Sequence, residues 1–192
     1  LLNAAAGGTR HEVLNAGAES YSTAQSLINI QFRLVEFDPD VIVLMHNVND
    51  ASVNVFGDQV APDYGNKYIS EFYLNPQLQG ALSLFGLLNQ SRLLSGLGLP
   101  QLVMSRNAID TERDFAPGLA LFKRNLEHIA AICKARDITL VLLSQPSVNE
   151  GFKYGVTVEH FKRYNDTIRA VASAQGVAFV DMYNAMGHDE RF

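Results

Sequence analysis

Residues 41–50 read VIVLMHNVND, in which five consecutive apolar residues lead directly into a histidine, two asparagines and an aspartate. A continuous apolar run of this length is typical of a strand that is covered on both faces, as in a parallel sheet. In open α/β sheets, ligands bind beyond the carboxyl ends of the strands. The polar residues that follow the run are therefore the first place to look for a functional site.

Strands and helices alternate along the chain on both sides of this stretch. The sequence predicts strands at residues 12–15, 41–45, 138–143 and 177–180, and helices at residues 22–36, about 119–133 and about 161–172. Ser22 and Gln25 fit a capping box for the first helix, and Gly176 is placed to end the last one. Cys133 falls on the apolar side of its helix. The alternation predicts a single α/β domain over residues 1–192, with a parallel sheet and helices on both faces.

Residues 51 to about 115 form an irregular insertion in this pattern. A helix is expected at residues 77–94, although two glycines interrupt it. The aromatic side chains of residues 54–75 allow two interpretations, namely the lining of a substrate pocket or a small apolar cluster of a surface excursion.

Composition limits the class of protein. The chain has 192 residues, a net charge of −5 and one cysteine. The absence of a basic stripe argues against nucleic-acid binding. No disulfide within the chain is possible, and no spacing of cysteine and histidine indicates a metal site. No apolar run reaches the ~20 residues of a membrane span. We expect neither a cofactor nor a metal.

Two strand tips offer hydrogen-bond donors. Gly17 presents a backbone N–H without an obstructing side chain, and Asn49 presents a carboxamide NH₂. Two donors that converge on one point can hold an oxyanion. The alternative is that Gly17 permits a tight turn and that Asn49 and Asp50 bond to local backbone. His46 either contacts substrate or packs beneath the loop.

Taken together, these blocks resemble the SGNH hydrolases, also called the GDSL esterase/lipase family. Gly17 in NAGAESYS matches the family's second block, and Asn47-Val48-Asn49-Asp50 matches its Gly-x-Asn-Asp block, with Asn47 in place of the glycine. The stretches LVLLSQP and GVAFVDM are similar to later family strands. The resemblance implies a flavodoxin-like α/β/α sandwich of three layers.

The departures from the family pattern concern the catalytic triad. Neither Gly-Asp-Ser nor Asp-x-x-His occurs in the chain. We therefore expect an internal fragment, truncated at both ends, with no catalytic residue inside it and no activity alone. Serines near the strand tips, combined with His46 or His188, do not replace the triad, because no Gly-x-Ser-x-Gly elbow is present. The serines considered are Ser20, Ser22, Ser52 and Ser144.

The resemblance implies a serine hydrolase that cleaves a carboxylic ester through an acyl-enzyme. Gly17 N–H and the Asn49 side chain would bind the oxyanion, and Asp50 would brace the turn that presents Asn49. The substrate would be a small-molecule or carbohydrate ester. One alternative is a polysaccharide O-acyltransferase on the same fold, and another is a non-catalytic α/β binding module. A third alternative is a nucleotide-binding domain, but the Gly-x-Gly-x-x-Gly motif that would follow a strand in such a domain is absent. The ester, the compartment and the oligomeric state stay open.

Overall fold

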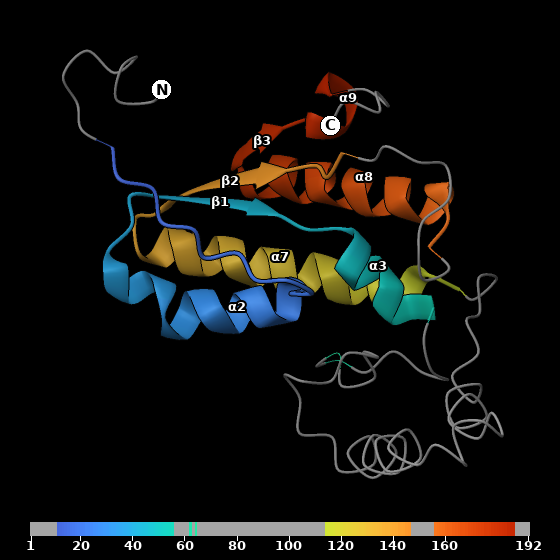
Figure 1. The fold of residues 1–192 in the computed structure, drawn as a ribbon, viewed down its shortest axis with the longest axis horizontal. Helices are drawn as coiled ribbons and strands as arrows, with labels where there is room; N and C mark the ends of the chain where they lie inside the picture. Colours follow the sequence, from blue (N-terminus) through green and yellow to red (C-terminus); the bar gives the residue numbers. More distant parts are fainter. Residues whose placement is uncertain (1–10, 56–61, 63, 65–113, 147–155, 187–192) are drawn as a thin grey trace, which may run out of the picture.

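The computed structural model describes residues 11–55, 62, 64, 114–146 and 156–186 (Figure 1). The elements follow one another as α2 (Thr23–Phe32), the 3₁₀ helix η1 (Leu34–Phe37), β1 (Val41–Met45), α3 (Val48–Val55), α7 (Ala116–Ala135), β2 (Thr139–Leu143), α8 (Val158–Gln175), β3 (Ala178–Val180) and α9 (Met182–Ala185).

The described strands form one parallel sheet in the order β1-β2-β3. Met45 pairs with Leu143, which in turn pairs with Val180, so the carboxyl ends of the strands lie at the same edge. The mixed α/β fold with a parallel sheet is confirmed. The strands predicted at residues 41–45, 138–143 and 177–180 are confirmed to within one residue.

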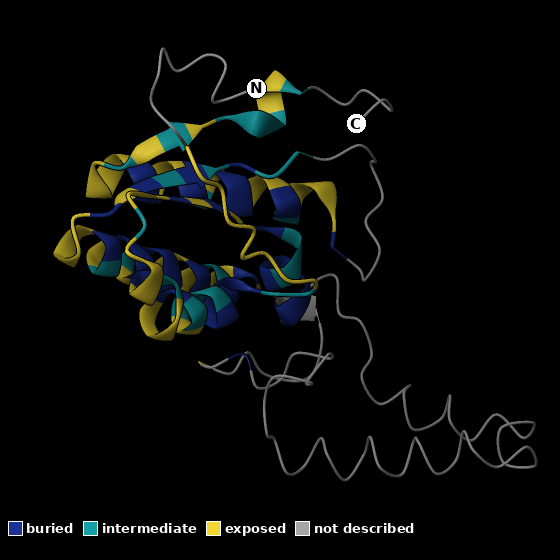
Figure 2. Cartoon of the chain, turned by 60° about the vertical axis from the view of Figure 1, so that its left-hand side comes forward, coloured by how far each residue is buried: buried dark blue, intermediate teal, exposed yellow. Residues whose placement is uncertain are grey.

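The helices α7 and α8 pack against one face of this sheet, and α2 packs against α7 on the same side. Ile42, Leu44, Leu140 and Leu142 point into the core that these helices share, and Figure 2 shows the buried residues concentrated there. On the other face Val43 is 61% exposed, whereas the apolar run predicted cover on both faces. The reason is handedness: right-handed crossovers that step the same way across a sheet place their helices on the same side.

The helices follow their predicted apolar stripes. Gln25 Oε1 accepts the Ser22 N–H at 2.8 Å, as the capping box predicts. The stripe of α7, including Cys133, and that of α8 are buried, and Gly176 ends α8 with a positive φ of 66°. In α2 the apolar stripe expected from the sequence, which included Leu27 and Ile28, is rotated, since Ile28 is 51% exposed while Ile30 is buried.

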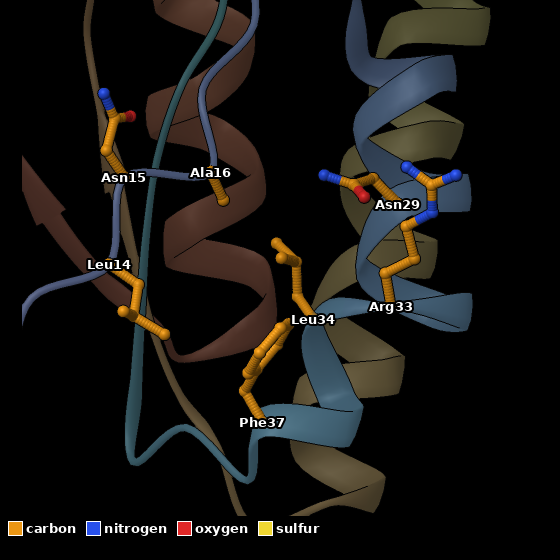
Figure 3. Close-up of a pocket in the computed structure, with 7 residues that line it drawn as sticks. All are labelled: Leu14, Asn15, Ala16, Asn29, Arg33, Leu34 and Phe37. Atoms are coloured by element: carbon orange, nitrogen blue, oxygen red, sulfur yellow. The ribbon is translucent and has the colours of Figure 1, made fainter.

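The strand predicted at residues 12–15 is not formed. Residues 11–18 contain no strand, and Val13 is 74% exposed. This segment has no hydrogen-bonded neighbour in the described sheet, and a strand requires one. Instead it lines a pocket of about 370 Å³ opposite α2 and η1 (Figure 3). The lining residues are Leu14, Asn15 and Ala16 on one side and Asn29, Arg33, Leu34 and Phe37 on the other.

Residues 51–55, which the sequence assigned to the insertion, belong to α3. The helix expected at residues 77–94 lies outside the described residues. Within the aromatic-rich stretch at residues 54–75, Tyr64 is described, and it is buried in a small cluster with Ala24 and Val53. Ala24 belongs to α2 and Val53 to α3, so Tyr64 packs on the main body of the domain, and both interpretations of the stretch stay predictions.

Candidate active site

Polar side chains gather at the carboxyl edge of the sheet, where α3 begins directly after β1 (Figure 1). The tips of β1, β2 and β3 contribute residues 46–50, Ser144 with Gln145, and Asp181. Side-chain hydrogen bonds connect the β1 tip to the start of α2, to the β2 tip and to α8. The parallel register therefore brings the tips of β1, β2 and β3 together, whereas Gly17 follows a segment that is not part of the described sheet.

Asn49 lies in the first turn of α3 rather than in a loop. Its Nδ2 donates to the Tyr21 carbonyl at 2.9 Å. A carboxamide NH₂ has two hydrogens, so this contact orients the group and leaves the second hydrogen for another acceptor. The same contact places Asn49 beside the segment that joins Gly17 to α2.

Gly17 is exposed, and its N–H donates to Asn15 Oδ1 at 3.0 Å. A Cβ at position 17 would lie 3.2 Å from the same oxygen. An oxyanion that binds this N–H has to displace an exposed asparagine side chain, which can rotate away into solvent. The joint action of Gly17 and Asn49 stays a prediction.

Asp50 is buried and holds α3 against α2. Its carboxylate oxygens accept the Thr23 N–H at 3.0 and 3.1 Å, and Oδ1 also accepts the Thr23 hydroxyl. Asn125 of α7 donates to the Thr23 hydroxyl oxygen at 3.1 Å. Burial raises the pKa of Asp50, against the opposing effects of nearby His46 and of the Thr23 hydrogen bonds. Asp50 thus braces two helix starts, a wider role than the local turn expected from sequence.

His46 is 9% exposed and lies between Ser26 and Asp50. Its Nε2 is 2.8 Å from Ser26 Oγ, and its Nδ1 is 3.7 Å from Asp50 Oδ2. The residue types and their order are those of a serine triad, although no motif in the sequence points to Ser26. Two features differ from a working triad. The histidine–aspartate distance exceeds a hydrogen bond, and the Ser26 N–H is committed to Ser22 O at 3.0 Å. Of the two roles considered for His46, these contacts support packing.

The structure explains Asn47, which stands where the family's Gly-x-Asn-Asp block has glycine. The backbone φ of Asn47 is not positive, so the backbone at this position does not require glycine. Its carbonyl oxygen accepts the N–H groups of Asp50 and Ala51, both at 2.9 Å, and begins α3. Its Nδ2 donates to Phe161 O at 2.7 Å and to Asn165 Oδ1 at 2.9 Å.

The other serines considered from sequence include three with hydrogen bonds inside the protein. Ser22 contacts Gln25, and Ser52 donates to Asn49 O at 2.9 Å. Ser144 donates to Asp181 Oδ1 at 3.0 Å and accepts the Tyr183 N–H at 2.9 Å. Among the described residues, none of these three hydroxyls forms a hydrogen bond with a histidine.

Asp181 allows a test by pH. Burial alone would raise the pKa of this carboxyl, but hydrogen bonds from Asn184, Ser144 and Arg169 outweigh burial and lower it. A lowered pKa in the folded state adds stability that is present above the unfolded value of about 4 and is lost as the pH falls through the folded value. Asp181→Asn should therefore lower the free energy of unfolding at neutral pH by less than about 1 kcal/mol, since solvent screens the site. Urea unfolding from about pH 7 to 2 should show the difference in stability between wild type and Asp181→Asn closing below about pH 4. A difference of constant size contradicts the assignment.

The architecture and the polar strand tips describe an α/β protein with a candidate site at the carboxyl edge of a parallel sheet. A family model described as GDSL-like Lipase/Acylhydrolase family matches residues 2–192, and the chain belongs to this family. The comparison with curated proteins gave no match. Family membership supports a general hydrolase function on small-molecule esters.

Two further properties concern the described part of the chain. It holds no group of three or more histidine, cysteine, aspartate or glutamate side chains placed to bind a metal. None of its helices combines the length and the apolar character that crossing a membrane demands.

Sequence reasoning missed three polar residues that fix the site, namely Thr23, Asn125 and Asn165. All three are buried. Asn165 lies four residues after Phe161 and Asn125 lies three after Phe122, so both occupy core-facing helix positions. An asparagine on an apolar stripe was the available signal, because a buried amide needs hydrogen-bond partners.

Proposed function

We propose that this protein hydrolyses carboxylic esters through an acyl-enzyme and that Asn49 stabilises the oxyanion, together with the Gly17 N–H. The observation that carries the proposal is the placement of Asn49 in a chain of the acylhydrolase family. It stands in the first helical turn after β1, with its carboxamide oriented by the Tyr21 carbonyl at 2.9 Å.

The electrostatics of this position favour a developing negative charge. The N-terminus of a helix carries a partial positive charge, and Asn49 lies within the first turn of α3. A carboxamide donor is neutral, so it strengthens its hydrogen bond as the carbonyl oxygen becomes an oxyanion without a proton transfer. Donors fixed before the reaction need no reorganisation when the charge develops.

In the proposed reaction a serine oxygen bonds to the ester carbonyl carbon while a histidine takes the serine proton. The tetrahedral oxyanion rests on Asn49 and Gly17. The bond to the alcohol oxygen then breaks, and the histidine returns the proton to the leaving alcohol. Water releases the acid from the acyl-enzyme in the same way. The motifs for this serine and histidine do not occur in residues 1–192, so the proposal assigns this chain the oxyanion side of the reaction.

The test is stopped-flow hydrolysis of p-nitrophenyl acetate by the intact protein. An acyl-enzyme predicts a burst of about one nitrophenol per active site, followed by slower steady release. Adding an acetyl acceptor such as a xylo-oligosaccharide separates the alternatives. Acetate release that exceeds transfer supports the hydrolase, whereas dominant transfer indicates the O-acyltransferase. Binding of esters without turnover would indicate the binding module.

A further inference from the structure

Asn165 of α8 joins the tips of β1 and β2 through one buried carboxamide. Its Oδ1 accepts from Asn47 Nδ2 at 2.9 Å and from the Gln145 N–H at 3.0 Å. Its Nδ2 donates to the Gln145 carbonyl at 3.0 Å. Asn165 is 5% exposed and Asn47 is 1% exposed. The side chain thus pairs with both main-chain groups of Gln145, as a neighbouring strand would, just beyond the last residue of β2.

The side chain of Gln145 then reaches across to the start of α3. Its Oε1 accepts the Val48 N–H at 3.2 Å. Val48 is the first residue of α3, and its N–H is one of the donors that a helix start leaves without an intrahelical acceptor. Gln145, which follows β2, therefore caps the helix turn that carries Asn49.

We propose that Gln145, held by Asn165, is a positioning residue for the first turn of α3 and through it for Asn49. This inference rests on the proposed function, in which the Asn49 carboxamide binds the oxyanion. Asn49 follows Val48 directly, so a rotation of the first turn moves the carboxamide with it. Sites of this kind work only within about 0.5 Å of the productive geometry.

Gln145 and Asp50 act on that turn from two sides, in addition to the side-chain hydrogen bonds of Asn47 and Asn49 described above. Gln145 fixes the Val48 N–H on the β2 side, and Asp50 fixes the turn to Thr23 on the α2 side at 3.0 Å. Removing the first leaves the second, so the helix still forms but its first turn gains freedom. We expect loss of Gln145 to act on the rate of the chemical step and to leave folding largely intact.

The test uses Gln145→Met, which keeps the length of the side chain and removes the acceptor. Gln145→Glu keeps an acceptor for the Val48 N–H, and the main-chain bonds to Asn165 persist in both variants. Gln175→Met is the matched control, because Gln175 is exposed at the far end of α8. For the intact protein, the measurements are kcat and KM for p-nitrophenyl acetate, the melting temperature, and hydrogen exchange of the Val48 amide by NMR.

Gln145→Met should lower kcat about tenfold with KM within about twofold, since the donor is displaced and not removed. The Val48 amide should exchange at least about tenfold faster. Gln145→Glu should restore slow Val48 exchange, and Gln175→Met should resemble the wild type in every measurement. Unchanged Val48 exchange in Gln145→Met overturns the proposal, as does faster exchange with unchanged kcat.

The outcome of Asn49→Ala separates this proposal from the proposed function. If Asn49→Ala keeps full kcat, the oxyanion role of Asn49 is wrong, whatever Gln145 does. In that case, faster Val48 exchange in Gln145→Met would still support Gln145 as the residue that orders α3, and unchanged exchange would overturn it.

Discussion

Asn49→Ala should lower kcat for ester hydrolysis by about 100- to 1,000-fold, the usual effect of removing one oxyanion-hole donor. KM should stay within about threefold, because this hydrogen bond strengthens only as the carbonyl oxygen becomes charged. Steady-state kinetics of the intact protein with p-nitrophenyl acetate measures both. Asn49→Asp should be at least as inactive, since a carboxylate of similar size offers no donor and repels the oxyanion.

The loss must arise from chemistry and not from unfolding. Asn49→Ala removes one part-buried hydrogen bond, to Tyr21 O at 2.9 Å, so the free energy of unfolding should fall by no more than about 1 kcal/mol. A urea titration of the variant checks this. A collapse of stability that parallels the loss of kcat would assign Asn49 a structural role only.

Ser26→Ala is the natural comparison, because Ser26, His46 and Asp50 have the composition of a triad. We expect kcat within about threefold of wild type, since the Ser26 N–H is committed to the helix and Asp50 lies 3.7 Å from the His46 ring. The opposite pattern, in which Ser26→Ala is inactive and Asn49→Ala is active, would place the nucleophile inside α2 and refute the proposed oxyanion role.

The parts of the fold that the sequence predicts well are those in which local pattern and tertiary packing agree. The runs at residues 41–45 and 138–143 form paired strands, and the α7 and α8 stripes face one core. Residues 12–15 show the opposite case. Their short pattern is compatible with a strand, but pairing with a neighbour decides whether a strand forms, and no pattern within four residues reports on that neighbour.

The residues of the candidate site show the same difference between what local sequence predicts and what tertiary packing decides. Asn47, Asn49 and Asp50 stand out in sequence because they follow an apolar strand. The residues that hold them do not stand out. Thr23 bonds to Asp50 across 27 positions, Asn165 bonds to Asn47 across 118, and Asn125 bonds in turn to Thr23 across 102. Residue type predicts that an amide or carboxylate needs partners, whereas only the packing of α2, α7 and α8 determines which partners it finds.

Asp50→Ala should have the largest effect on stability, lowering the free energy of unfolding by about 2–3 kcal/mol. The variant leaves the Thr23 N–H without the acceptor that it has at 3.0 Å, inside a site where Asp50 is 1% exposed. It also removes the link between the starts of α2 and α3. Urea unfolding measures the change. Asp166→Ala on the exposed side of α8 is the matched control, and it should stay within about 0.5 kcal/mol of wild type.

The pH dependence of the stability difference between wild type and Asp50→Ala gives an independent check on the protonation state of the Asp50 carboxyl. Burial raises the pKa of Asp50 in the folded protein, so the folded state holds the proton more tightly than the unfolded chain does. The contribution of Asp50 to stability is therefore greatest below the unfolded value of about 4 and declines as the pH rises through the raised folded value. The stability gap between wild type and Asp50→Ala should narrow over that window. A gap that widens with rising pH would mean that the charged form is the favoured one, with the Thr23 hydrogen bonds and His46 outweighing burial.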